Sequence, residues 1–88
     1  MDIDRSALTT VSYSRQALKT LRRLSVTDGK RIRDAIQTFF ETGTGDVVRL
    51  REREGFRLRV GDWRVIFDLE GHVLAVLKIG PRGDVYHH

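Results

Sequence analysis

The 88-residue sequence predicts an α+β fold of the order β-α-α-β-β-β(-β), in which a helical hairpin packs on one face of a small antiparallel sheet. The first half of the chain predicts the helices, because apolar residues recur there at intervals of three and four. The second half predicts the strands, because apolar and polar residues alternate there between turn residues. We expect a single domain over residues 1–88, with residues 1–8 as a loose leader and 85–88 as a tail.

One short strand and two helices are expected before residue 44. Residues 9–13 are rich in β-forming residues and predict an edge strand. The helices are expected over residues 15–24 and from about residue 28 to 42, joined by a short break and therefore antiparallel. Their expected N-caps are Ser14 and either Ser25 or Thr27, and Gly43 is the expected stop signal.

Residues 56–67 predict a β-hairpin whose two-residue turn is Gly61-Asp62. This turn fixes the register, so that three apolar pairs share one face: Phe56 with Phe67, Leu58 with Val65, and Val60 with Trp63. The helices should cover this face. The opposite face then carries Arg57, Arg59, Arg64 and Ile66.

Two further strands are expected around this hairpin. Residues 47–51 form a short strand or an extended lead-in, and residues 52–55 form a turn. Residues 72–79 are apolar on both faces and predict a central strand, which Gly80-Pro81 should end. Strict alternation would place Val73, Ala75, Leu77 and Ile79 on the arginine side, as an apolar strip that needs a covering partner.

The predicted register sets Arg59 directly opposite Arg64, although like charges in such a pair destabilise a sheet. One interpretation is a solvated basic face; the other is an anion site, since the arginine fork matches phosphate oxygens. For an exposed pair, removal of either arginine should leave folding unharmed while activity falls.

Composition limits the classes of function. The charged fraction is 32% and the hydrophobic fraction 40%, as in a folded globular protein, and no apolar run approaches the ~20 residues of a membrane span. No cysteine is present, so disulfides and thiol chemistry are excluded, and a cytoplasmic location is expected. The net charge of +4 and the pI of about 10.1 favour a polyanionic partner, either nucleic acid or an acidic protein segment.

Three segments, in this order and spacing, resemble the RelE/ParE toxin superfamily of bacterial type II toxin–antitoxin systems. They are residues 13–21, the hairpin of residues 56–67, and Gly80-Pro81-Arg82-Gly83-Asp84-Val85-Tyr86. The RelE-like branch consists of ribosome-dependent mRNA endonucleases that need no metal or cofactor. The resemblance implies a catalytic set of Arg57, Arg59, Arg64, Arg82 and Tyr86. The reaction would be attack of a ribose 2′-OH on the adjacent phosphate.

The sequence departs from this branch on the first hairpin strand. Well-known members carry lysines where this chain has Arg57 and Arg59, and arginine is a poor base because it stays protonated. Another group would have to move the proton; the candidates are His87, His88 and Glu54. The terminal histidines could equally be a disordered end or part of a purification tag, and Tyr86 could pack on the sheet edge instead of stacking on a base.

Three functions follow from the resemblance. The first is an mRNA endoribonuclease toxin that acts in the ribosomal A site and is neutralised by a cognate antitoxin. The second is a ParE-like toxin that poisons DNA gyrase without catalysis of its own. The third is a degenerate or merely RNA-binding member. The convergence of Arg64, Arg82 and Tyr86 favours the first, and the missing lysines favour the second.

Overall fold

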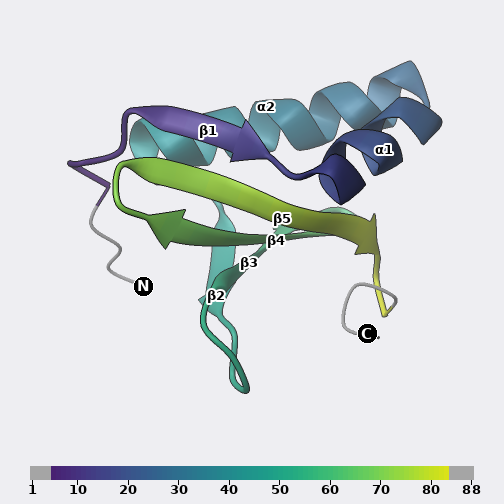
Figure 1. Cartoon of the computed structure of the whole chain (residues 1–88). Helices are drawn as coiled ribbons and strands as arrows, with labels where there is room; N and C mark the ends of the chain where they lie inside the picture. Colours follow the sequence, from purple (N-terminus) through teal and green to yellow (C-terminus); the bar gives the residue numbers. More distant parts are fainter. Residues whose placement is uncertain (1–4, 84–88) are drawn as a thin grey trace.

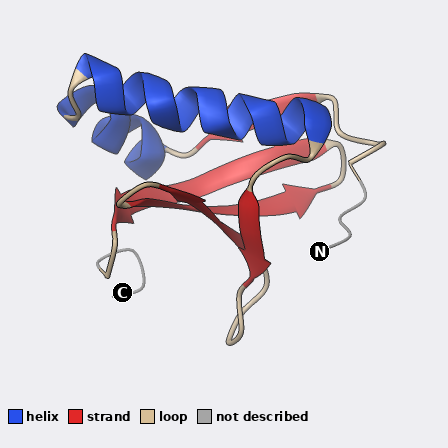
Figure 2. Cartoon of the chain, turned by 180° about the vertical axis from the view of Figure 1, so that it is seen from behind, coloured by secondary structure: helices blue, strands red, loops and turns tan. Residues whose placement is uncertain are grey.

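Two helices cover one face of a five-stranded sheet in the computed structural model, which describes residues 5–83 (Figures 1 and 2). The strands lie in the order β1-β5-β4-β3-β2, and the predicted α+β class and order of elements are confirmed. The elements are β1 Thr10–Tyr13, α1 Arg15–Arg23, α2 Val26–Thr42, β2 Asp46–Arg49, β3 Phe56–Val60, β4 Trp63–Glu70 and β5 Val73–Pro81.

The sheet is mixed, so the expectation of a wholly antiparallel sheet is wrong for its first strand. β1 runs parallel to β5, with Thr10 beside Val73 and Tyr13 beside Val76, whereas β2 to β5 pair antiparallel. The physical reason is that residue alternation determines which face a side chain takes but carries no information on the direction of the neighbouring strand.

Both helices begin at the expected N-caps, and α2 ends at the expected glycine. The Ser14 hydroxyl accepts a hydrogen bond from the Ala17 amide at 3.0 Å, and the Ser25 hydroxyl accepts one from the Asp28 amide at 3.1 Å. Gly43 ends α2 with φ of 77°, a left-handed conformation that favours glycine.

The first turn of α1 also closes an edge of the sheet. β5 continues past the end of β1, and the Ser14 hydroxyl donates to the Leu77 carbonyl at 2.6 Å. The Gln16 side-chain amide then accepts from the Ile79 N–H at 3.2 Å and donates to its carbonyl at 3.4 Å. Side chains of α1 therefore replace the strand partner that this part of β5 lacks.

The central hairpin has the predicted register. Phe56 lies opposite Phe67, Leu58 opposite Val65, and Val60 opposite Trp63. The side chains of this face pack against α1 and α2 in the main core, where the Phe39 and Phe67 rings lie 5.3 Å apart. The buried members of this core are Ala17, Leu21, Ile32, Ile36, Phe39, Phe56, Leu58, Val60, Val65, Phe67, Leu74, Val76 and Ile79.

A β-bulge in β5 overturns the predicted apolar strip. The register shifts between Ile66 and Phe67 of β4, so that Leu77 is the extra residue of β5. Beyond the bulge, Ile79 pairs with Val65 and joins the helix-side core. Val73 and Ala75 do lie on the arginine side, but Ala75 is buried, and Leu77 is 41% exposed. The strip is therefore broken, because one inserted residue exchanges the faces of all the residues that follow it.

Residues 5–8, expected as part of a loose leader, make defined contacts instead. The Arg5 guanidinium donates to the Phe40 carbonyl at 3.4 Å, and Leu8 packs against the main core. The Ala7 carbonyl lies 2.8 Å from Nδ1 of His72. Apolar contact and backbone hydrogen bonds hold this segment against the ends of α2 and β5. Within residues 5–83, no helix is long and apolar enough to cross a membrane.

The Phe39→Ala variant should lose about 3–5 kcal/mol of unfolding free energy, the range for large-to-small changes in a core. Urea denaturation measures this loss. The matched control is Val26→Ala, because the Val26 side chain is 86% exposed on the same helix; it should change stability by under about 0.5 kcal/mol. A loss below about 1 kcal/mol for Phe39→Ala would contradict the assignment of the core-facing side of α2.

Candidate active site

The face of the sheet opposite the helices carries the predicted arginines, and we call it the arginine face. Arg57 and Arg59 lie on β3, and Arg64 lies on β4 directly opposite Arg59. Arg59 is exposed, Arg57 is half-buried and Arg64 is buried. Lys78 also lies on this face, opposite Ile66, because the bulge in β5 turns it there. Lys78 was not among the predicted residues, since strict alternation assigns it to the other face.

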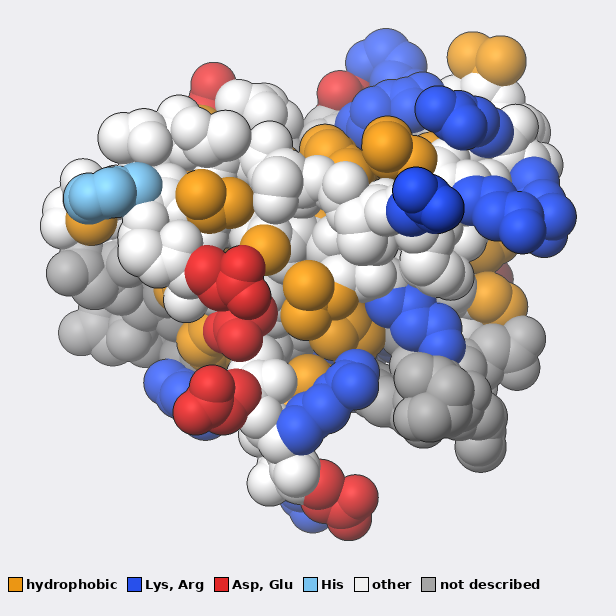
Figure 3. Space-filling model, viewed as in Figure 1, with side chains coloured by type: hydrophobic (Ala, Val, Ile, Leu, Met, Phe, Trp, Pro, Cys, Tyr) orange, Lys and Arg blue, Asp and Glu red, His pale blue; other side chains and the backbone are white. Residues whose placement is uncertain are grey.

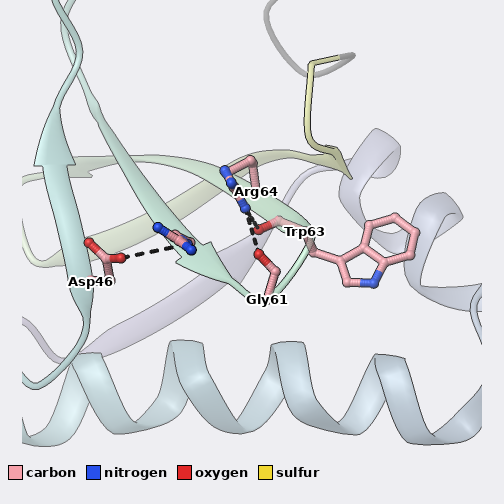
Figure 4. Close-up of polar contacts among 5 residues, drawn as sticks. Asp46, Gly61, Trp63 and Arg64 are labelled. Carbon is pink, nitrogen blue, oxygen red and sulfur yellow. Dashed lines mark hydrogen bonds and ion pairs between the residues drawn. The ribbon is translucent and has the colours of Figure 1, made fainter.

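Arg64 is held by the turn that precedes it. Its Nη1 atom donates to the Gly61 carbonyl at 2.8 Å and to the Trp63 carbonyl at 2.9 Å (Figure 4). The residue is only 8% exposed. Both bonds use one nitrogen, so the described residues do not engage the Nη2 and Nε edge of the fork. Gly80, which lies opposite Arg64 on β5, has no side chain to crowd it. Arg64 is therefore both a support of the turn and a fixed donor.

Arg59 lies between a like charge and an opposite one. Its Nε atom is 3.9 Å from the Asp46 carboxylate, which lies opposite it on β2, while Arg64 lies opposite it on β4. The side chains of Arg59 and Asp46 are more than half exposed, so this ion pair is weak and Arg59 remains accessible to an anion. Asp46 was not predicted to lie here, because the strand was expected to begin at residue 47.

Arg82 follows β5 and is fixed to the same turn through its backbone. Its N–H donates to the Asp62 carbonyl at 2.9 Å, and its side chain is exposed. The strand pairing extends further than expected, since Pro81 still lies opposite Trp63. The structure thus brings Arg59, Arg64 and Arg82, which are up to 23 positions apart in the sequence, to the Gly61-Asp62 turn.

A further guanidinium reaches this turn from the helical layer. A Cβ atom placed on Gly61 would lie 2.9 Å from Nη2 of Arg31, a residue of α2. Arg31 is exposed and contributes positive charge at the edge of the arginine face. No sequence pattern predicts this contact, because helical spacing shows only that Arg31 lies beside the core-facing Ile32.

The predicted proton-transfer residues are not brought to the turn by the described part of the chain. Glu54 is exposed in the loop between β2 and β3, which lies at the end of β3 away from the Gly61-Asp62 turn. Tyr86, His87 and His88 lie outside the described residues.

Tyr13, at the end of β1, has a shifted pKa. Burial raises this pKa above its usual value of 10.0, while Arg33 opposes the shift; Tyr13 therefore remains protonated at neutral pH.

The arrangement is suited to an anion with several oxygens. Guanidinium groups form paired, charge-assisted hydrogen bonds with phosphate oxygens, and rigidly held donors stabilise charge that develops during a reaction. The side chains of Arg59 and Arg82 are exposed, and Arg64 is anchored at the same turn. Within residues 5–83, no group of three or more His, Asp or Glu side chains is arranged to hold a metal ion.

Comparisons with solved structures show the same fold in toxin–antitoxin proteins. A chain of the archaeal RelE–RelB complex from Pyrococcus horikoshii OT3 has a TM-score of 0.71 at 26% identity, over 84% of this chain and 94% of that chain. The RelB–RelE antitoxin–toxin complex from Methanococcus jannaschii gives 0.70 at 17% identity, over 88% and 96%. The YoeB dimer from Staphylococcus aureus gives 0.67 at 15% identity, over 90% and 97%.

Sequence comparison gives the family directly. No sequence among curated proteins matches this chain significantly. Residues 11–86, however, match the model of a family described as the ParE toxin of the type II toxin–antitoxin system parDE. The match spans both helices and all but the first residue of the five-stranded sheet. The chain therefore belongs to the ParE toxin family of type II toxin–antitoxin systems, within the RelE/ParE superfamily.

Proposed function

We propose that this toxin is an endoribonuclease that cleaves mRNA in the ribosomal A site and so inhibits translation. The observation that supports this most is the convergence of Arg59, Arg64 and Arg82 on one turn at an open face of the sheet. These residues come from β3, β4 and the segment after β5. A protein that only binds another protein does not need arginines from three separate segments gathered at one turn.

The reaction we propose begins with attack of a ribose 2′-OH on the adjacent phosphorus. The new O–P bond forms as the bond to the 5′-oxygen breaks, which leaves a 2′,3′-cyclic phosphate and a 5′-OH. Negative charge grows on the phosphate oxygens, where Arg59 and Arg64 would stabilise it, and on the leaving oxygen, which we assign to Arg82. Arg57 would bind the neighbouring phosphate.

Proton transfer requires a group other than these arginines, because a guanidinium does not give up its proton. His87 follows Arg82 by five residues, so the chain can bring it to the turn, whereas Glu54 is at the far end of β3. We propose His87 as the proton-transfer residue ahead of Glu54. Tyr86 would offer a flat face on which an mRNA base can stack.

The second candidate, a gyrase poison, is supported by the ParE name of the matching family model. It leaves the arginine cluster without a role, and we rank it lower for that reason. For either target we propose a cognate antitoxin, since several related structures are described as toxin–antitoxin complexes. Acidic residues of the antitoxin would cover Arg59 and Arg82 in a cytoplasmic complex.

The Arg82→Ala variant should cleave mRNA about 100-fold more slowly than the parent, the usual loss on removing one transition-state donor. Its melting temperature should be unchanged, because the exposed side chain supports nothing else in the described structure. Primer extension on a translated message measures cleavage. Arg22→Ala on α1 removes the same charge from an exposed site and should cleave normally. Parental cleavage by Arg82→Ala would refute this site; gyrase-dependent DNA breaks without mRNA cleavage would support the alternative function.

The Arg64→Ala variant should lose both activity and stability, which corrects the expectation drawn for an exposed pair. Removing this buried guanidinium leaves two carbonyls without their donor, which costs about 1–3 kcal/mol. The Arg59→Ala variant should change stability by less than about 1 kcal/mol, because its ion pair is exposed. Chemical denaturation of both variants measures the contrast. Equal stability of the two variants would show that the hydrogen bonds of Arg64 do not support the turn.

A further inference from the structure

An open hollow lies beside the hairpin of β2 and β3, which projects from the rest of the sheet (Figure 1). Its volume is about 840 Å³, within the range of ligand sites in proteins. Four of its seven lining residues are arginines and one is a glutamate, which gives the lining a net charge of +3. The lining residues are Val48, Arg49, Leu50, Arg51, Glu52, Arg53 and Arg57.

A hydrogen bond and close packing hold the backbone of this hairpin in place. The Leu50 N–H donates to the Gly55 carbonyl at 3.0 Å and closes the loop of residues 51–54. Gly55 has φ of 117°, and a Cβ atom there would lie 3.0 Å from the Phe67 carbonyl oxygen, so the loop packs closely on β4. Arg49 lies over the Phe56 ring at 5.0 Å, which fixes its guanidinium at the hairpin.

More basic than acidic residues of this loop line the hollow. Residues 51–54 alternate as Arg, Glu, Arg, Glu, and the hollow is lined by both arginines but only by the first glutamate. At the bottom of Figure 3, the projecting hairpin carries basic and acidic side chains next to one another. The apolar residues of the lining, Val48 and Leu50, add a surface on which a base can rest. A basic groove with an apolar surface suits single-stranded nucleic acid.

Arg57 connects this hollow to the candidate active site. It lines the hollow and also lies on the arginine face, two residues before Arg59 and therefore about 6.6 Å from it along β3. The positive surface thus runs from the Gly61-Asp62 turn through Arg59 and Arg57 to the loop arginines.

We propose that this hollow is a second RNA-binding subsite, which holds a nucleotide of the same mRNA strand several positions from the cleaved bond. The inference rests on the proposed ribonuclease function. Arg51 and Arg53 bind a phosphate, and Val48 and Leu50 contact the base. The subsite contributes affinity and strand direction, and it does not touch the reacting atoms.

The test is the double variant Arg51→Ala/Arg53→Ala against the control Arg22→Ala/Arg23→Ala, whose arginines are equally exposed on α1. Figure 3 shows the separate basic cluster around α1, at the upper right. Fluorescence anisotropy with a short labelled single-stranded RNA, at several KCl concentrations, measures binding without ribosomes. The hairpin variant should bind about tenfold more weakly and lower the salt slope by about 0.7, the value for one lost phosphate contact on a single strand. Equal weakening by the control would overturn the subsite.

A second measurement separates this inference from the proposed function. With programmed ribosomes, the hairpin variant should need about tenfold more toxin for half-maximal cleavage, while its single-turnover rate at saturation stays parental. If the hairpin variant binds and cleaves like the α1 control, the subsite is wrong and the ribonuclease function stands. If the parent does not cleave but the hairpin variant alone loses RNA affinity, the ribonuclease function and the relation of the hollow to a cleaved bond are wrong, and only RNA binding at the hollow stands. Loss of ribosome affinity with unchanged affinity for the free RNA would overturn the assignment to mRNA and indicate ribosomal RNA.

Discussion

The two-residue turn at Gly61-Asp62 sets the register of β3 against β4, and the site depends on that register. Each residue of β3 has one partner on β4, so the turn decides which side chains enter the core and which form the arginine face. Arg64 donates hydrogen bonds to the Gly61 carbonyl of this turn and to the Trp63 carbonyl beside it. The Arg82 backbone N–H donates to the Asp62 carbonyl. The turn is therefore supported by the residues whose positions it determines.

The positive charges of the three arginines at the turn are compensated in different ways when no anion is bound. Arg64 is buried against carbonyl dipoles, which offset part of the cost of burying a cation. Arg59 is balanced by Asp46 across β2, and Arg82 is exposed to water. Repulsion within the cluster is thus reduced in three separate ways. A bound phosphate would replace the weak Asp46 contact and the water without disturbing the support that Arg64 gives to the turn.

The features that could be predicted from the sequence are those that residue alternation and turn residues determine locally. Alternation around a two-residue turn was enough to predict the pairing of Leu58 with Val65 and of Arg59 with Arg64. It could not predict the parallel direction of β1 or the bulge at Leu77, because neither follows from the pattern of one strand alone. The burial of Arg64 and the approach of Arg31 depend on tertiary packing, for which no residue spacing gives a signal. The roles of Tyr86 and His87 remain proposals taken from family resemblance.

The side chains of Ser14 and Gln16 have a consequence for how this protein can exist in a cell. β5 is the longest strand, with nine residues, and only its first four pair with β1. An open edge on the remainder would invite strands of other molecules to add there, the usual start of edge-to-edge aggregation. Because Ser14 and Gln16 occupy that edge, and β1 and β2 are only four residues long, the described sheet offers little template for such growth.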